Sequence, residues 1–168
     1  MNIQIRPTTF ETRQEFASLL DEANTWQKAR GSQGWTGVFD DDWMLPRIDR
    51  GELYLVYMVG EPVSAFRILY EDRAFWGERE VGDSIYLHTF AVRRSKAGLG
   101  IGNAVIEMVV SMGRKRSLAK VRLDCFLANT RLISFYERNG FSSVGTTVVN
   151  GKMLNLMERV IGSPTDIS

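Results

Sequence analysis

The segment "FAVRRSKAGLGIGNAVIEMVVSM", residues 90–112, decides the fold of this 168-residue chain. A short apolar stretch leads into a basic patch, then into glycines at alternate positions, and then into apolar residues spaced three and four apart. The residues at this helical spacing are Ile101, Ala104, Val105, Met108, Val109 and Met112. The segment therefore predicts a strand, a flexible turn and an amphipathic helix in succession.

The glycine turn predicts an anion site. The first turn of a helix has backbone N–H groups without an acceptor and the positive end of the helix dipole. Glycines at 98, 100 and 102 let the backbone turn tightly and approach a ligand closely. Together these features favour a phosphate ligand. A tight turn that binds nothing is the alternative.

Two known phosphate loops can be compared with this turn. A Walker loop ends in Gly-Lys-Ser/Thr, but Gly102 is followed by Asn103 and Ala104. The dinucleotide fingerprint needs glycines at relative positions 1, 3 and 6. Gly98 and Gly100 fit the first two positions, and Asn103 stands at the third. A dinucleotide-binding oxidoreductase, with Asp124 as the ribose-binding acid, is therefore a weaker alternative.

From the first residue to the last, the sequence pattern predicts one strand, two helices, three strands, a helix, a strand, a helix and two strands, in that order. Strands are predicted at 2–7, 52–59, 62–70, 84–92, 120–126, 142–149 and 152–161. Helices are predicted from a Thr8–Glu11 capping box to about Gly31, at 40–51, from 101 to the basic run at 113–117, and at 129–139. Residues 71–83 read as a charged loop. Strand 84–92 is apolar on both faces, which favours a central place in the sheet.

Composition limits the class of protein. The apolar fraction is 44%, the charged fraction 24% and the net charge +1, so nothing favours a nucleic-acid partner. The lone Cys125 fits a reducing compartment, and no apolar run is long enough for a signal peptide or a membrane span. We therefore expect one cytoplasmic domain over residues 1–168, with no metal and no membrane contact.

At this point the sequence resembles the GNAT family of N-acetyltransferases. The pyrophosphate loop of that family is Gln/Arg-x-x-Gly-x-Gly/Ala, and "AGLGIG" at 97–102 matches both glycines. The leading Gln/Arg is Ala97 here, so Arg93, Arg94 or Lys96 must supply the charge. The second motif, an Asn followed by Phe/Tyr-Tyr-x-x-x-Gly-Phe, matches Asn129, Tyr136, Gly140 and Phe141.

The resemblance implies an α+β (mixed α/β) fold. A central mixed, mostly antiparallel sheet of about seven strands would contain a parallel strand–helix–strand core and be flanked by about four helices. In the family the two parallel strands splay apart and leave backbone groups unpaired at the edge of the first strand.

The resemblance also implies acetyl-CoA as the cofactor. The loop would hold the pyrophosphate, and the end of strand 84–92 would hydrogen-bond the pantetheine arm. The residues to which this assigns cofactor binding are Phe90, Ala91, Val92, Lys96, Ala97, Gly98, Leu99, Gly100, Ile101, Gly102, Asn103, Asn129 and Tyr136.

The implied reaction moves an acetyl group directly to an amine. Tyr136 is the expected general acid toward the CoA thiolate, and His88, the only histidine, is the expected base, with a water chain as the alternative. Glu78 and Glu80 are weaker candidates for the base. A covalent role for Cys125 is disfavoured because buried cysteines are usually inert.

The acceptor, a small-molecule or peptide amine, is expected against aromatic walls formed by Trp26, Trp35 and Trp76, with His88 beside it. The segment that carries Trp76 is expected to act as a lid. The sequence leaves open the acceptor, the acyl-chain length, the base and the oligomeric state, a homodimer included. A non-catalytic acyl-CoA-binding module is the alternative from another functional class.

Overall fold

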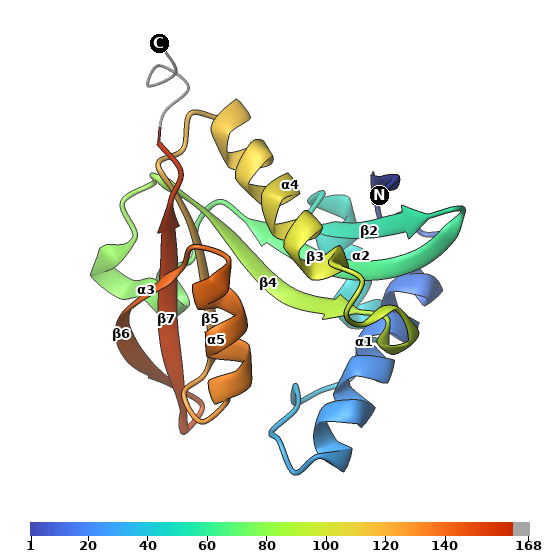
Figure 1. The fold of residues 1–168 in the computed structure, drawn as a ribbon, viewed down its shortest axis with the longest axis horizontal. Helices are drawn as coiled ribbons and strands as arrows, with labels where there is room; N and C mark the ends of the chain where they lie inside the picture. The colour runs from blue at the N-terminus through green and yellow to red at the C-terminus, as the bar shows by residue number, and fades with distance from the viewer. Residues whose placement is uncertain (163–168) are drawn as a thin grey trace. The chain divides into compact units, whose positions relative to one another are not determined.

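Strand β4 (Ser84–Val92) occupies the middle of the sheet, as its apolar sequence predicts. The computed structural model describes residues 1–162, and within them one seven-stranded sheet has the order β1-β2-β3-β4-β5-β7-β6 (Figure 1). The other strands are β1 (Ile3–Pro7), β2 (Leu53–Met58), β3 (Glu61–Leu69), β5 (Lys120–Phe126), β6 (Ser142–Val149) and β7 (Lys152–Val160).

The strand pairing confirms a mixed, mostly antiparallel sheet. β4 pairs with β5 in parallel, whereas β1 with β2, β2 with β3, β5 with β7 and β6 with β7 are antiparallel. The β2–β3 connection places Val59 and Gly60 at positive φ, and the β6–β7 connection does the same at Asn150 and Gly151. Two consecutive residues at positive φ are typical of a tight two-residue hairpin turn, which "NG" at 150–151 predicted.

Five α-helices lie in the described residues, one more than expected. They are α1 (Arg13–Ala29), α2 (Asp41–Asp49), α3 (Arg73–Trp76), α4 (Ile101–Lys115) and α5 (Thr130–Arg138), with 3₁₀ turns η1 (Gly77–Arg79) and η2 (Arg94–Lys96). The extra helix, α3, forms inside the segment expected to be a charged loop. Asp72 initiates it, because its side chain accepts a hydrogen bond from the Phe75 amide.

The predicted capping box at Thr8 is wrong. The Thr8 amide donates to the Leu53 carbonyl at 2.8 Å, which extends the pairing of β1 with β2, so Thr8 is not a helix cap. Helix α1 begins five residues later, at Arg13, with Thr12 as its N-cap and no side-chain cap hydrogen bond. Its end at Ala29, followed by Gly31 at a φ of +73°, agrees with the predicted stop.

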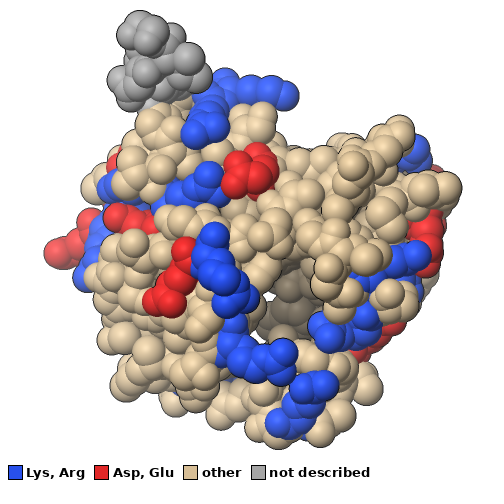
Figure 2. Space-filling model, viewed as in Figure 1, with Lys and Arg blue, Asp and Glu red and all other residues tan. Residues whose placement is uncertain are grey.

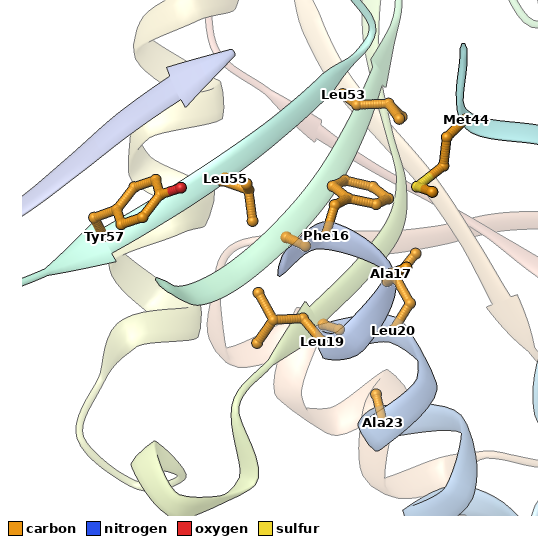
Figure 3. Close-up of a cluster of buried hydrophobic side chains, with 11 residues drawn as sticks. Phe16, Ala17, Leu19, Leu20, Ala23, Met44, Leu53, Leu55 and Tyr57 are labelled. Atoms are coloured by element: carbon orange, nitrogen blue, oxygen red, sulfur yellow. The ribbon is translucent and has the colours of Figure 1, made fainter. Parts of the chain in front are cut away.

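The described chain forms two compact units. Unit 1 contains Met1–Ile68 and Thr89–Val105, and unit 2 contains Leu69–His88 and the described residues from Ile106 onward. In unit 1, one face of α1 packs on the β2–β3 hairpin (Figure 3). The core residues of unit 1 are Phe16, Ala17, Leu19, Leu20, Ala23, Met44, Leu53, Leu55, Tyr57, Ala65 and Ala91.

A second, smaller core lies in unit 2, where Trp76, Tyr86 and Leu156 pack together.

Helix α4 buries Ile101, Val105 and Val109 of the predicted stripe, but Ala104, Met108 and Met112 are only half-buried. Ile106, Val110 and Gly113 are buried instead, so the apolar face is rotated from the predicted one. None of the helices within residues 1–162 combines the length and the apolar character that crossing a bilayer demands.

Candidate active site

The glycine turn of unit 1 leads into α4. Gly98 and Gly100 have φ values of +80° and +78°, which favour glycine. A Cβ at Gly98 would meet nothing within 4 Å, and one at Gly100 would meet only the tip of Met1. The first hydrogen bond of the helical ladder joins the Ala104 amide to the Gly100 carbonyl at 3.1 Å. The amides of residues 101–103 therefore have no acceptor inside the helix, which fits a phosphate ligand.

The basic side chains before the glycines differ in their partners. Arg93 lies 3.8 Å from a Glu61 carboxylate oxygen, and Lys96 lies 3.2 Å from the other oxygen of Glu61. The Arg94 guanidinium lies over the Trp26 ring at 3.7 Å, and no ion pair joins it to a carboxylate in the described part of the chain. Basic side chains gather around this segment on the face drawn in Figure 2. Arg94 is thus the basic group of this turn that is least neutralised.

At the end of β4, some backbone N–H and C=O groups are directed away from β3. The Arg93 amide donates to the Val63 carbonyl at 2.8 Å, and the Ala91 carbonyl accepts from the Ser64 hydroxyl at 2.7 Å. Adjacent residues in a strand direct their backbone groups to opposite edges. Phe90 and Val92 therefore direct theirs to the edge opposite β3, whereas Ala91 directs its own toward β3.

The pairing of β4 with β5 is short. It joins only Ser84, Ile85 and Tyr86 to their partners, although β4 continues to Val92 and β5 to Phe126. Thr89 has a φ of +50°, a conformation that costs a β-branched residue about 1–2 kcal/mol. The pairing of β4 with β5 therefore ends at Tyr86, two residues before His88, and strained backbone follows His88 at Thr89.

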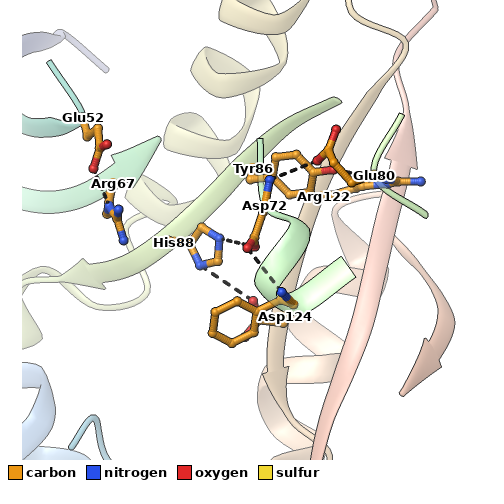
Figure 4. Close-up of polar contacts among 9 residues, drawn as sticks. Glu52, Arg67, Asp72, Glu80, Tyr86, His88, Arg122 and Asp124 are labelled. Carbon is orange, nitrogen blue, oxygen red and sulfur yellow. Dashed lines mark hydrogen bonds and ion pairs between the residues drawn. The ribbon is translucent and has the colours of Figure 1, made fainter. Parts of the chain in front are cut away.

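His88 lies between two carboxylates, all within unit 2 (Figure 4). Its Nε2 atom is 2.8 Å from Asp72 Oδ2, and its Nδ1 atom is 3.7 Å from Asp124 Oδ2. One oxygen or nitrogen atom of each residue lies within 4.8 Å of those of the other two. The Phe75 ring packs against the imidazole at a centroid distance of 5.7 Å. The site is thus compact and mostly buried, with side-chain exposures of 13%, 4% and 13% for His88, Asp72 and Asp124.

Asp72 is held in place by its own backbone. Its amide donates to Glu80 Oε2 at 3.0 Å, and the Gly82 amide donates to Glu80 Oε1 at 2.7 Å. Burial of Glu80 opposes its ionisation, but these hydrogen bonds and one with Tyr86 outweigh the burial, so the pKa of Glu80 is lowered. Glu80 therefore serves to order the segment that carries Asp72, and both of its carboxylate oxygens are in use.

Tyr136 of α5 is buried, with 5% of its surface exposed, against Phe135 and Phe141. Burial raises its pKa, and the neighbouring Cys125 and Asp124 raise it further, so the phenol stays protonated at neutral pH. Burial likewise raises the pKa of the Cys125 thiol to about 12, with a further contribution from Asp124, which leaves little thiolate for covalent chemistry. Tyr136 and Asp124 are therefore electrostatic neighbours.

The remaining predicted residues have the following positions. Asn129 is the N-cap of α5, where its side chain accepts from the Leu132 amide at 3.2 Å. Trp26 lies beneath both Arg94 and Arg30, and Trp35 packs edge-to-face on Phe39 at 5.7 Å. Leu99 and Gly100 are exposed.

Trp76 is the exception among the expected aromatic walls. It is only 2% exposed, with its ring 5.9 Å from that of Tyr86 and the Arg122 guanidinium 4.4 Å above it. Its side chain thus fills the core of unit 2 and does not lie on a surface that a substrate could reach.

Sequence reasoning missed Asp72, and it considered Asp124 only as a ribose-binding acid. A helix-capping signal was available at Asp72, three residues before Phe75. No local signal could have indicated that Asp72 and His88 meet.

The sequence matches that of a known protein family. The sequence model of the acetyltransferase (GNAT) family matches residues 14–141, about three quarters of the chain. The chain belongs to this family. The uncharacterized N-acetyltransferase YesJ of Bacillus subtilis (strain 168) is 31% identical over 147 residues, which are 83% of this chain and 81% of YesJ. By enzyme class the chain is therefore an N-acetyltransferase.

Solved structures of GNAT proteins have the same fold as this chain. A GNAT acetyltransferase from Listeria monocytogenes matches with a TM-score of 0.78 at 25% identity, covering 94% of both chains. The PaiA N-acetyltransferase of Thermoplasma acidophilum, solved in complex with coenzyme A, matches with a TM-score of 0.72 at 15% identity, covering 95% of this chain and 99% of that one. The family uses acetyl-CoA, and the residues of the glycine turn fit its diphosphate.

Proposed function

We propose that this chain transfers the acetyl group of acetyl-CoA to a primary amine of a small molecule or peptide by direct attack. The observation that carries the proposal is the turn at residues 98–103. Gly98 and Gly100 stand at positive φ, only the tip of Met1 approaches the space beside them, and the first amides of the helix have no acceptor within α4. These features suit a diphosphate group.

In this proposal unit 1 holds the cofactor. Backbone N–H groups of residues 96–103 donate hydrogen bonds to the diphosphate. Phe90 and Val92 form backbone hydrogen bonds with the pantetheine amides, as an added strand would. Acetyl-CoA supplies an activated thioester carbonyl. Asn129 caps α5 and is proposed to contact the cofactor as well.

Tyr136 is proposed as the general acid. Its buried phenol keeps its proton at neutral pH and can donate it toward the sulfur that leaves the acetyl group. The hydroxyl does not need full ionisation, because a hydrogen bond to the developing thiolate already stabilises the charge.

His88 is proposed as the base. An alkyl amine with a pKa near 10.4 must lose a proton before attack, which costs roughly 4–5 kcal/mol at pH 7. A histidine can accept that proton in this pH range. His88 follows the end of the β4–β5 pairing and has carboxylates beside both nitrogens.

The aromatic side chains of unit 1 are proposed to contact the acceptor. Trp26 and Trp35 are half-buried and belong to α1 and to the segment after it. Trp26 already carries two guanidinium groups over its ring, at 3.7 and 4.5 Å, so its face attracts cations.

The experiment is release of free CoA thiol from acetyl-CoA in the presence of a panel of amines. We expect turnover with at least one primary amine, and mass spectrometry should find that amine heavier by one acetyl group. Acetyl-CoA that raises the melting temperature without turnover on any amine would instead support a non-catalytic acyl-CoA-binding module. Stabilisation by NAD alone would contradict both readings.

A further inference from the structure

The two nitrogens of His88 face carboxylates in different ways. Nε2 lies 2.8 Å from Asp72 Oδ2, which is a hydrogen bond, whereas Nδ1 lies 3.7 Å from Asp124 Oδ2, which is too long for one. A neutral imidazole has one N–H donor and one acceptor nitrogen. A carboxylate accepts only, so the Asp72 contact places the proton on Nε2 and leaves Nδ1 as the free nitrogen.

Asp72 is built to fix this orientation. Its other oxygen, Oδ1, accepts from the Phe75 amide at 3.4 Å, and its own amide is tied to Glu80 at 3.0 Å. Asp72 is only 5% exposed. The aspartate therefore cannot turn away from His88 without disrupting the start of α3.

Asp124 has the weakest contact of this group, an ion pair with His88 Nδ1 at 3.7 Å. Its Oδ2 atom is buried and has no hydrogen-bond partner among the residues that the structure describes. Burial of an unpaired carboxylate is costly, and a cation would relieve that cost. The titratable groups that influence this position are Asp72, His88, Cys125 and Tyr136. Apart from His88, none of these can offer Asp124 a positive charge.

From this geometry we infer that the acceptor amine arrives as its ammonium ion, pairs with Asp124 and gives its proton to Nδ1 of His88, with Asp72 as the positioning residue. This inference rests on the proposed function and deepens it. The nitrogen–hydrogen bond breaks toward Nδ1, the nitrogen electron pair forms the bond to the thioester carbon, and the carbon–sulfur bond breaks as Tyr136 protonates the sulfur. The acylated nitrogen still carries one excess proton, which passes through water to the Tyr136 phenolate and leaves a neutral amide. The imidazolium of His88 then releases its proton to water, so that both residues return to their starting states.

The inference names a substrate class. Primary alkyl amines, which are cationic at neutral pH, should be preferred over aromatic amines, which are neutral there. A charge-assisted contact is worth about 1.5–3 kcal/mol, which corresponds to a preference of roughly ten- to hundredfold.

The positioning role can be tested without any acceptor, because the chain has a single histidine. In protein labelled with ¹⁵N-histidine, long-range ¹H–¹⁵N correlations report which ring nitrogen carries the proton. At alkaline pH we expect the wild type to show Nε2–H with Nδ1 unprotonated. In Asp72→Asn that preference should weaken, because an amide can donate a hydrogen bond to Nε2 as well as accept one from it. A wild-type spectrum with Nδ1–H, or an unchanged Nε2–H preference in a folded Asp72→Asn, would overturn the inference. If Asp72→Asn does not fold, the wild-type spectrum alone decides.

Asp124 is tested with the alkyl amine that the panel identifies and with aniline. We expect Asp124→Asn to raise KM for the alkyl amine about ten- to hundredfold, to leave KM for acetyl-CoA within about twofold, and to change the aniline rate little. An equal loss on both amines would overturn the ion pair. A failure of the proposed function would look different, since neither protein would then release thiol with any amine.

Discussion

Nε2 of His88 lies 2.8 Å from Oδ2 of Asp72, a residue sixteen positions earlier in the chain. The contact joins the middle of β4 to the residue that initiates α3. Glu80 holds the Asp72 amide, so three residues in one stretch of sequence determine how the imidazole is presented. Positioning of the proposed base therefore depends on the short helix that the sequence did not reveal.

Glu80 should make this segment sensitive to acid. Its folded pKa is lowered, so its contribution to stability is present above its unfolded value near 4.3 and is lost as the pH falls through the folded value. Glu80→Gln should lower the free energy of unfolding at pH 7 by about 1–3 kcal/mol. Urea unfolding as a function of pH measures this difference. The two proteins should converge as the pH falls from the unfolded pKa of a glutamate through the lowered folded pKa of Glu80, and a difference that does not shrink with falling pH would contradict the ionic role.

Tyr136→Phe should separate binding from chemistry. The ring and its packing on Phe141 remain, and only the hydroxyl is removed. CoA affinity by calorimetry should stay within about twofold, while kcat should fall about a hundredfold or more if the hydroxyl acts as general acid. Tyr57→Phe is the matched control, since it removes a hydroxyl that donates to Glu15 in unit 1. An unchanged kcat in Tyr136→Phe would remove the residue from the mechanism.

Gly100→Ala should weaken cofactor binding more than it weakens the fold. Alanine at a φ of +78° costs about 1 kcal/mol of stability. Gly51→Ala is the control, because Gly51 has a φ of +70° and no atom within 4 Å of an added Cβ, but lies after α2. Both variants should lose similar stability in urea, and only Gly100→Ala should lose CoA affinity, by about tenfold or more. Equal CoA affinities in the two variants would contradict a role for the turn.

Arg94 should supply the charge that the motif lacks at Ala97. The Arg94 backbone amide donates to Glu22 Oε2 at 3.0 Å, but its guanidinium has no carboxylate partner in the described residues, whereas the Lys96 ammonium is paired with Glu61. Arg94→Gln should raise the Kd for CoA about tenfold, and the difference should shrink at high salt. Lys96→Gln should change the Kd less. The reverse order in calorimetric titrations would assign the charge to Lys96.

The sequence revealed what is local and missed what depends on packing. The turn into α4 and the cap at Asn129 could be predicted, because each depends on residues a few positions apart. The meeting of His88 with Asp124 depends on the register of two parallel strands, and no local pattern encodes it. The burial of Trp76 depends on contacts with Tyr86 and Arg122, which are distant in sequence.

A crystal structure of the protein with coenzyme A tests the central claim most directly. The account predicts that diphosphate oxygens lie about 2.7–3.2 Å from backbone nitrogens of residues 98–103, with the pantetheine arm along Phe90 and Val92. Coenzyme A bound elsewhere, with those amides free of any phosphate, would contradict the account.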